Sequence, residues 1–262
     1  MGSSGRAAKI NPLLGRTADV TINRKLGCRN IRHKNITYPV NIGYFDLEKD
    51  LGERKHTVYI IGASNTSDTF SAKIIAVIRH MDSGKMLAVA APEEMRYYEP
   101  EIRECLNFFE RQYVSEYEFY YEKKCGVIAH GTENGVLKYL LVRNAKTDHI
   151  EFPDTDVQFG ESEKESAVRA LIQKTGIAPE IASDFRTDYT VSMDSGSKKT
   201  SVFYTADFTG SMPRVADESV AGVLILTFEE AIRSLERPQD RIVLAEAHDN
   251  YEFKRKSGFS MQ

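Results

Sequence analysis

The chain has 262 residues, of which 41% are apolar, so its length and composition allow two modest globular domains, each with its own core. Its formal net charge of −3 gives no overall attraction to nucleic acid or to an anionic membrane, and no segment is long and apolar enough to cross a bilayer. The chain starts without an apolar run of signal-peptide type, and its three cysteines lack metal-type spacing, so we expect reduced thiols and a cytoplasmic protein.

The first half of the chain has the pattern of short strands followed by one helix. Alternating apolar and polar residues predict strands at 18–22, 36–45, 57–62, 72–78 and 86–90. A helix is predicted at 99–113, with Ile102, Leu106, Phe109 and Tyr113 on one apolar stripe. We therefore expect a domain at 12–118 that forms a small β-barrel with a covering helix, preceded by a flexible tail at 1–11.

Six basic residues surround the first turn of this expected barrel: Arg24, Lys25, Arg29, Arg32, His33 and Lys34. Such a cluster can bind a phosphate group, although a run of charge is more often a solvated face. Both interpretations stay open on the sequence.

Four ordered blocks in this half, at 20–27, 38–44, 58–62 and 88–95, resemble family I inorganic pyrophosphatases. Residues 52–57 stand where that family has an acidic metal-binding cluster, and Ile42 stands where it has a phosphate-contacting tyrosine. Asp82 keeps one carboxylate. Because pyrophosphatase chemistry needs several metal ions, the resemblance implies a β scaffold used for packing or dimerisation rather than an active pyrophosphatase.

A helix with defined ends is predicted within residues 157–177. Ser162 followed by Glu165 is a capping box, and Thr175-Gly176 is a helix stop, so about three helical turns should lie between them. Apolar residues at helical spacing are expected to face a core: Val168, Leu171 and Ile172. That leaves Ala170, Gln173 and Lys174 together on a neighbouring face.

This layout resembles the Nudix box, in which a loop, a helix and a second loop hold magnesium against a diphosphate. Gly176-Ile177 fix the register, which puts Glu161 on the first glutamate of the pattern and Arg169 on its arginine. The three glutamates that carry the metal ions fall on degenerate positions: Ala170, Gln173 and Lys174. A methyl group, an amide and an ammonium cannot replace three anionic oxygens around Mg²⁺.

The flanking sequence, about 119–253, resembles Nudix enzymes of the diadenosine tetraphosphate hydrolase type. Residues 124–142 look like their opening hairpin, with a turn at 133–135, and 199–204 resembles their K-T-V-x-Y strand. Phe203 stands where that strand has a phosphate-contacting tyrosine. The resemblance implies a Nudix α/β/α sandwich, hence an α+β protein of two domains. The second domain is expected at 119–255, and a flexible tail at 256–262.

The resemblance supplies the candidate catalytic residues Glu161 and Glu218, the latter matching a glutamate that can serve as base or metal ligand. With Glu165 they are the candidate ligands of one weakly held Mg²⁺. The simpler alternative for Glu161, Glu163 and Glu165 is that they complement the helix dipole. Alternating helix positions do not share a face, so the three carboxylates are not expected to form one metal site.

Lys174 leads to a sharper hypothesis. Its ammonium would stand near the family's metal position and could contact ligand phosphates directly as a point charge. Arg169, Lys198 and Lys199 would add to the same phosphate pocket, although Arg169 in the Nudix pattern mainly pairs with a glutamate of the helix.

Three functions remain open. The favoured one is a binder of a nucleoside or dinucleoside polyphosphate that is catalytically weak or inactive. The second is a hydrolase of such compounds that recruits metal through Glu161, Glu163, Glu165 and Glu218. The third is a protein-interaction scaffold with both pockets vestigial. We expect no nucleic-acid and no membrane partner, and the pyrophosphatase resemblance implies a homodimer.

Overall fold

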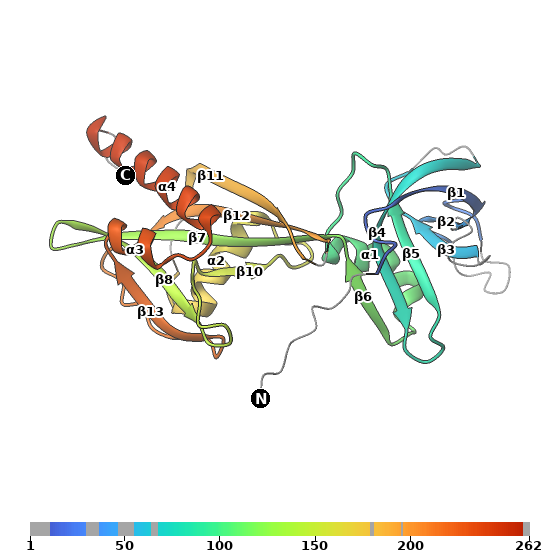
Figure 1. Ribbon diagram of the computed structural model, residues 1–262, viewed down its shortest axis with the longest axis horizontal. Coiled ribbons are helices and arrows are strands. Elements are labelled where there is room, and N and C mark those ends of the chain that lie inside the picture. Colours follow the sequence, from blue (N-terminus) through green and yellow to red (C-terminus); the bar gives the residue numbers. More distant parts are fainter. Residues whose placement is uncertain are drawn as a thin grey trace. The chain divides into compact units, whose positions relative to one another are not determined.

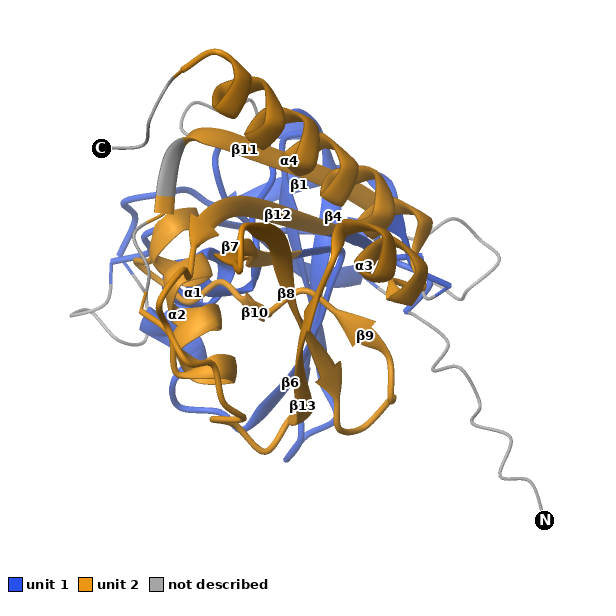
Figure 2. Cartoon of the chain, turned by 90° about the vertical axis from the view of Figure 1, so that its left-hand side faces the viewer, with its two compact units in different colours: residues 1–122, 191–199 blue, residues 123–190, 200–262 orange. Residues whose placement is uncertain are grey.

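The computed structural model describes residues 11–29, 37–46, 55–63, 68–178, 181–194 and 196–258. The chain divides into two compact units, residues 1–122 with 191–199 and residues 123–190 with 200–262 (Figures 1 and 2). Within the described ranges, no helix has the length and apolar character needed to cross a membrane. The cysteines are free thiols, and that of Cys125 is fully buried.

The first unit contains a closed β-barrel. Its strands are β1 (Thr17–Arg24), β2 (Asn41–Asp46), β3 (Lys55–Ile60), β4 (Thr69–His80) and β5 (Met86–Ala91). They pair in the order β1-β2-β3-β5-β4, and β1 also pairs with β4, which closes the ring. The pairing of β3 with β5 is parallel, and β6 (Ser115–Phe119) extends the sheet beyond β4.

Two apolar clusters lie on the two faces of the barrel wall. The inner cluster includes Val20, Phe45 and Val58, while the outer one packs Tyr59 and Val89 against helix α1 (Glu99–Glu110). The covering helix buries Ile102 and Leu106 completely. The prediction of a small barrel with a covering helix is therefore confirmed at the level of its elements.

A buried polar trio also connects α1 to the barrel. Glu110 on α1 accepts hydrogen bonds from the Tyr59 hydroxyl at 2.7 Å and lies 2.8 Å from His80 Nε2. His80 in turn stacks on Tyr113 at a ring-centroid distance of 4.1 Å. Since the helix ends at Glu110, the predicted extension to Tyr113 is wrong, and Tyr113 follows the helix as a stacking partner.

Other predicted boundaries also need correction. The strand expected at 36–45 begins at Asn41, because the chain bends at residues 39–40, where Pro39 has no backbone N–H for a ladder. Asn11, assigned to a flexible tail, is tied down: its backbone N–H donates to Glu118 at 3.2 Å and its side chain accepts from Leu13 N at 3.1 Å.

Several sequence expectations fall outside the described residues. These are residues 1–10, the basic residues Arg32, His33 and Lys34, the 52–54 part of the degenerate pyrophosphatase segment, and residues 259–262 of the expected C-terminal tail. The described positions of the pyrophosphatase resemblance show Ile42 buried and Asp82 exposed in the turn after β4.

The second unit is a three-layer arrangement around a sheet. Its main path is β11 (Ile181–Ser192), β12 (Lys198–Asp207), β7 (Tyr121–Glu133), β8 (Val136–Asn144) and β13 (Val220–Leu226). Two short strands join it: β9 (Ile150–Glu151) pairs with β8, and β10 (Asp154–Asp156) pairs with β7. The predicted turn between β7 and β8 is confirmed, with Asn134 and Gly135 both at positive φ.

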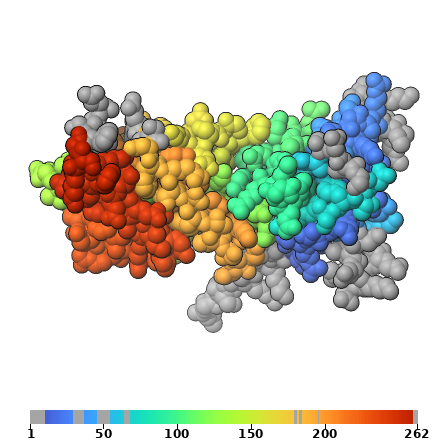
Figure 3. Space-filling model, turned by 90° about the horizontal axis from the view of Figure 1, so that it is seen from above, coloured from blue at the N-terminus to red at the C-terminus, as the bar shows by residue number. Residues whose placement is uncertain are grey.

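Helices cover both faces of this sheet (Figure 2). Helix α2 (Glu163–Thr175) packs Ala167 and Leu171 against one face. Helices α3 (Phe228–Ser234) and α4 (Pro238–Lys256) pack Ala231 and Leu244 against the other. The outer side of α4 forms part of the molecular surface, in red in Figure 3. Its last residue is Lys256, so the expected tail starts at least one residue later.

Candidate functional site

Helix α2 has the ends that the sequence predicts. Ser162 is the N-cap: its hydroxyl accepts from Glu165 N at 3.2 Å, and the Glu165 carboxylate accepts from Ser162 N at 2.8 Å. Gly176 closes the helix at φ 73°, a left-handed conformation that glycine adopts without steric cost. The loop, helix and second loop of the box are therefore built as predicted.

The buried face of α2 differs from the predicted one. Ala167, Ala170 and Leu171 are fully buried, whereas Val168 is half-buried and Ile172 is 41% exposed. The prediction of Val168 and Ile172 as core residues is wrong, because the two alanines are small enough to bring the helix close to the sheet. Ala170 therefore lies in the core and does not share a solvent-facing site with Gln173 and Lys174.

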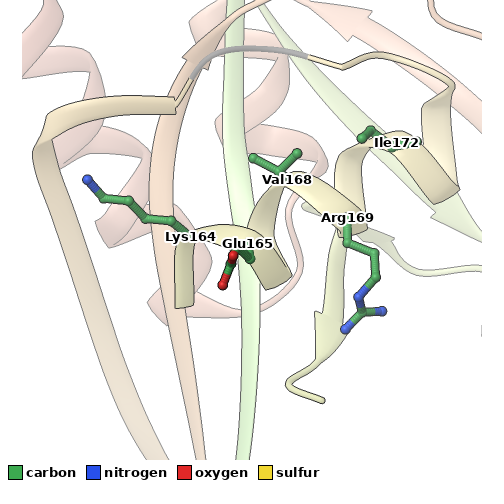
Figure 4. A pocket seen from close by; sticks show the side chains of 5 residues that line it. All are labelled: Lys164, Glu165, Val168, Arg169 and Ile172. Atoms are coloured by element: carbon green, nitrogen blue, oxygen red, sulfur yellow. The ribbon is translucent and has the colours of Figure 1, made fainter. Parts of the chain in front are cut away.

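Val168 and Ile172 instead line a shallow depression of about 330 Å³ on the outer side of α2 (Figure 4). Lys164, Glu165 and Arg169 complete its rim. Its lining carries no cluster of polar groups directed at a ligand, so we do not assign the ligand site to it.

Arg169 of α2 holds the preceding loop, residues 155–161, against the helix. Its guanidinium donates to both carboxylate oxygens of Glu161 at 2.6 and 2.8 Å, to Asp156 O at 2.8 Å and to Thr155 Oγ1 at 3.2 Å. It also donates to the amide oxygen of Gln173 at 3.2 Å. The Arg169 bonds, with others from Ser166 and Gln158, lower the pKa of Glu161 to about 2. Arg169 is thus engaged within the loop and helix, but its partner is Glu161 of the loop rather than the glutamate of the helix that the Nudix pattern implied.

Lys174 lies between two carboxylates. Its ammonium is 3.7 Å from Glu151 Oε1 and 3.7 Å from Asp154 Oδ1. The side chains of Lys174, Glu151 and Asp154 are only 14%, 10% and 5% exposed, so these charges are largely removed from water. The cation stands at the position where the Nudix pattern has its last metal-binding glutamate.

Two more cations belong to the same group of charges. Lys124 lies 3.3 Å from Asp154, and Arg237 lies 3.5 Å from Glu151. We call Lys124, Glu151, Asp154, Lys174 and Arg237 the Lys174 cluster. Burial opposes ionisation of Lys124, but Asp154 and its acidic neighbours outweigh burial and raise its pKa. The cluster carries three cations and two anions.

The loop at 209–219 connects to the end of α2. Arg214 N donates to Thr175 O at 3.0 Å, and Ala216 N donates to Lys174 O at 3.3 Å. The pKa of Asp217 is lowered mainly by hydrogen bonds from Ser219, with a smaller contribution from the charge of Lys174. The next residue, Glu218, is exposed. The structure thus brings the loop that carries Glu218 to the C-terminal end of α2.

The first turn of α2 is held by a separate carboxylate. Glu163 accepts hydrogen bonds from Lys123 at 2.9 Å, Arg186 at 2.9 Å and the Tyr204 hydroxyl at 3.1 Å. Burial raises the pKa of Glu163, but the bonds from Arg186 and Lys123 outweigh it and lower the pKa to about 2. Glu161, Glu163 and Glu165 therefore each have their own partners.

The remaining predicted ligand contacts lie elsewhere. Phe203 is buried between Phe152 and Tyr189, with ring centroids 5.1 and 6.1 Å away, because strand alternation turns it toward α3 and α4. It is therefore a core residue rather than a phosphate contact. Lys198 and Lys199 open β12 and belong to the first unit.

The donor set at the box positions does not fit a divalent cation. Ala170 has no donor atom, the Gln173 oxygen already accepts from Arg169, and Lys174 is itself a cation. Throughout the described ranges, no group of three His, Cys, Asp or Glu side chains is arranged to hold a metal ion. Glu151 and Asp154 are not predicted from the sequence, because their only local signal is an acidic character just before the box.

No protein-family model matches this chain, and comparison with curated proteins also finds no match. Solved structures similar to about half of the chain are Nudix proteins. The Ap4A hydrolase of C. elegans in a binary complex is 17% identical, with a TM-score of 0.47 over 50% of this chain and 98% of that one. The NUDIX domain of Shewanella oneidensis NrtR, complexed with ADP ribose, is 17% identical, with a TM-score of 0.44 over 49% and 87%. A NUDIX hydrolase from Nitrosomonas europaea is 18% identical, with a TM-score of 0.40 over 49% and 89%.

Proposed function

We propose that the second unit binds a nucleoside or dinucleoside polyphosphate and hydrolyses it slowly or not at all. The class of ligand comes from the resemblance of residues 119–253 to Nudix enzymes. The observation that supports binding without efficient hydrolysis is the position of Lys174, whose ammonium lies between Glu151 and Asp154.

A tethered ammonium and a magnesium ion do different chemistry. Both supply positive charge to a phosphate, but only the metal ion coordinates a water molecule and lowers its pKa so that a hydroxide forms near neutral pH. Lys174 therefore provides charge neutralisation without an activated nucleophile. The capped helix and the Arg169–Glu161 pair keep the frame of the site in place.

The lengths of its ion pairs support contact between Lys174 and a ligand. Its two ion pairs are 3.7 Å long, whereas strong charge-assisted hydrogen bonds measure roughly 2.7–2.9 Å. A phosphate oxygen would replace these weak contacts, while Lys124 and Arg237 continue to compensate the carboxylates of Asp154 and Glu151. The ligand would then be bound without a metal ion.

Calorimetric titration with dinucleoside polyphosphates, nucleoside triphosphates and pyrophosphate in the presence of a chelator tests this proposal. We expect binding by the parent protein and at least tenfold weaker binding by Lys174→Met, which keeps the length of the side chain but removes its charge. Lys164→Met changes an exposed lysine of the same helix and serves as the matched control. If Lys174→Met and the parent protein bind these ligands with equal affinity, Lys174 is not part of the ligand site.

The hydrolase is the second candidate, and the hydrogen bonds between the 209–219 loop and the end of α2 favour it, since they hold Glu218 near the box. Its test is product formation from the same compounds with Mg²⁺ or Mn²⁺, followed by chromatography. Rapid turnover that Glu161→Gln and Glu218→Gln both abolish would support the hydrolase against the binder. If neither turnover nor binding is observed, a protein-interaction scaffold is the remaining candidate function.

A further inference from the structure

The barrel of the first unit has the strand order of an oligonucleotide-binding barrel. Five strands close in the order β1-β2-β3-β5-β4 and back to β1, with β3 parallel to β5. In barrels of this type, the face of strands 2 and 3 and the loops between strands 1 and 2 and between strands 4 and 5 bind single-stranded nucleic acid or oligosaccharides. Here the strands β1, β2 and β3 lie side by side (Figure 1).

Helix α1 covers only part of the outer wall. It packs on the side that carries Ile42 and Tyr59. The strand register aligns Thr21, Tyr44 and Thr57 across β1, β2 and β3, and all three side chains are half-buried rather than covered. A row across the three strands therefore remains accessible.

Charge is distributed unevenly along this part of the chain. Among the described residues between 20 and 45, three are lysine or arginine and none is aspartate or glutamate, although the whole protein has a net charge of −3. The adjoining acids of the wall are Asp19 on β1 and Asp46 on β2. Arg24, Lys25 and Arg29 are exposed at the β1 end of the connection to β2. Lys25 pairs with Asp68 at 2.9 Å, but both side chains are more than half exposed, so this pair is weakly held. In Figure 3, the described atoms of the N-terminal strands, coloured blue, lie at the molecular surface.

Cations and aromatic rings also meet on this wall. Lys55 Nζ lies 4.3 Å from the centroid of the Tyr44 ring, and the Arg24 guanidinium lies 5.7 Å from that of Tyr38. Tyr38 is buried, so Tyr44 is the ring with access to solvent. Single-stranded nucleic acid is recognised by this combination, since cations follow the phosphates and an aromatic ring stacks with a base of any sequence.

We propose that the β1–β2–β3 wall of the first unit binds single-stranded nucleic acid, with Arg24, Lys25 and Arg29 contacting phosphates and Tyr44 contacting a base. The net charge of the chain does not attract nucleic acid, but the exposed cations Arg24, Lys25 and Arg29 make this part of the surface locally positive. The site lies in the first unit and is independent of the function proposed for the second.

Fluorescence anisotropy with labelled 15-nucleotide single-stranded RNA and DNA, measured from 25 to 200 mM salt, tests the proposal. We expect binding at low salt, and at least tenfold weaker binding by the triple variant Arg24→Glu, Lys25→Glu, Arg29→Glu. Since each phosphate contact contributes about 0.7 to the slope of log affinity against log salt for single strands, the slope should fall by about 2. Tyr44→Ala should weaken binding with an unchanged slope.

The matched control is the triple variant Arg79→Glu, Arg111→Glu, Lys146→Glu, which makes the same charge change at other exposed positions. It should bind within about twofold of the parent protein. Circular dichroism melting confirms that each variant is folded, and the single change Lys25→Ala replaces the triple variant if that protein does not fold. Failure of the parent to bind either oligonucleotide, equal losses in both triple variants, or binding only to vesicles with anionic lipid would each overturn the proposal.

Discussion

Lys174 puts a positive charge beside Glu151 and Asp154, at a helix position that the Nudix pattern gives to a carboxylate. The pairing stabilises the cluster in the absence of any metal ion. It also means that one substitution changes the sign of the charge facing two nearly buried acids.

Lys174→Glu is therefore expected to create a cation site. Three carboxylates would then face one another, which destabilises the folded protein until a divalent ion binds, because like charges in a poorly solvated site repel one another. Thermal unfolding with increasing Mn²⁺ should show a metal-dependent rise in Tm for Lys174→Glu that the parent protein lacks. Lys174→Met serves as the control, since it removes the cation without adding a ligand. Identical responses of the two variants to Mn²⁺ would contradict this view of the cluster.

Glu161 should make stability depend on pH. The pKa of Glu161 in the folded protein is about 2, below the ordinary value of 4.5. A carboxyl group with a depressed pKa contributes stability that is present above pH 4.5 and is lost as the pH falls toward 2. Glu161→Gln should lower the free energy of unfolding at pH 7 by roughly 1–2 kcal/mol, since charged hydrogen bonds to Arg169 are lost from a partly exposed site.

Urea unfolding at pH 7, 4.5 and 2.5 measures this effect. The difference between parent and Glu161→Gln should shrink toward the lowest pH, while Glu163 contributes equally to both proteins. A difference that stays constant over this range would show that the pair with Arg169 does not account for the stability.

At the residue scale, the sequence predicts contacts that follow a local pattern. The register of the box brings Glu161 and Arg169 together because both belong to one loop and helix. Glu151 and Asp154 were not found, because their partner Lys174 is some twenty residues away and only the pairing of β9 and β10 with the sheet brings them near it.

At the scale of the element, α2 shows which features local chemistry determines. Both caps were predicted because Ser162, Glu165 and Gly176 act on backbone groups a few residues away. The buried face was not, because Val168, Leu171 and Ile172 fit one helical stripe as well as Ala167, Ala170 and Leu171 fit another. Close packing on the sheet selects the stripe with the alanines.

Ser162→Ala should destabilise the second unit by about 1 kcal/mol, the usual effect of losing an N-cap side chain. The change removes the acceptor for Glu165 N. Urea unfolding followed by far-UV circular dichroism measures it, and Ser211→Ala, in an exposed turn, is the control. If the loss of unfolding free energy is no larger than that of the control, water hydrogen-bonds to the backbone N–H of Glu165 as well as the Ser162 hydroxyl does.

At the scale of the whole molecule, each unit has its own apolar clusters, so the two units are expected to unfold separately. Leu106→Ala removes a fully buried side chain of the first unit and should cost about 2–5 kcal/mol there. Cys125 reports on the second unit, since burial raises the pKa of its thiol to about 12 and keeps it unreactive until that unit opens.

Thiol labelling in increasing urea, read by peptide mass spectrometry, follows the units through Cys105 and Cys125. Leu106→Ala should shift the labelling midpoint of Cys105 to lower urea and leave that of Cys125 unchanged, while Leu26→Ala, at an exposed site, should shift neither. Equal shifts of both midpoints would indicate one cooperative unit.

The sequence indicated two parts, but their organisation depends on distant pairings. Alternation located the strands β1 to β5 of the barrel, whereas the closure of the barrel through β1 and β4 joins segments about fifty residues apart and has no local signal. Likewise, nothing in the local pattern of 191–199 assigns it to the first unit. The cytoplasmic location, the homodimer and the pyrophosphatase origin of the barrel stay predictions.

Closure of the barrel has a consequence for solubility. Because β1 pairs on both sides, β6 is the strand of this sheet, among those described, that leaves one side without a neighbour. Glu116 and Glu118 are its exposed residues, and like charges on such a strand repel the same strand of another molecule. We predict that replacing both with threonine increases light scattering in concentrated solution, because the like charges that oppose pairing of two copies of β6 are then lost.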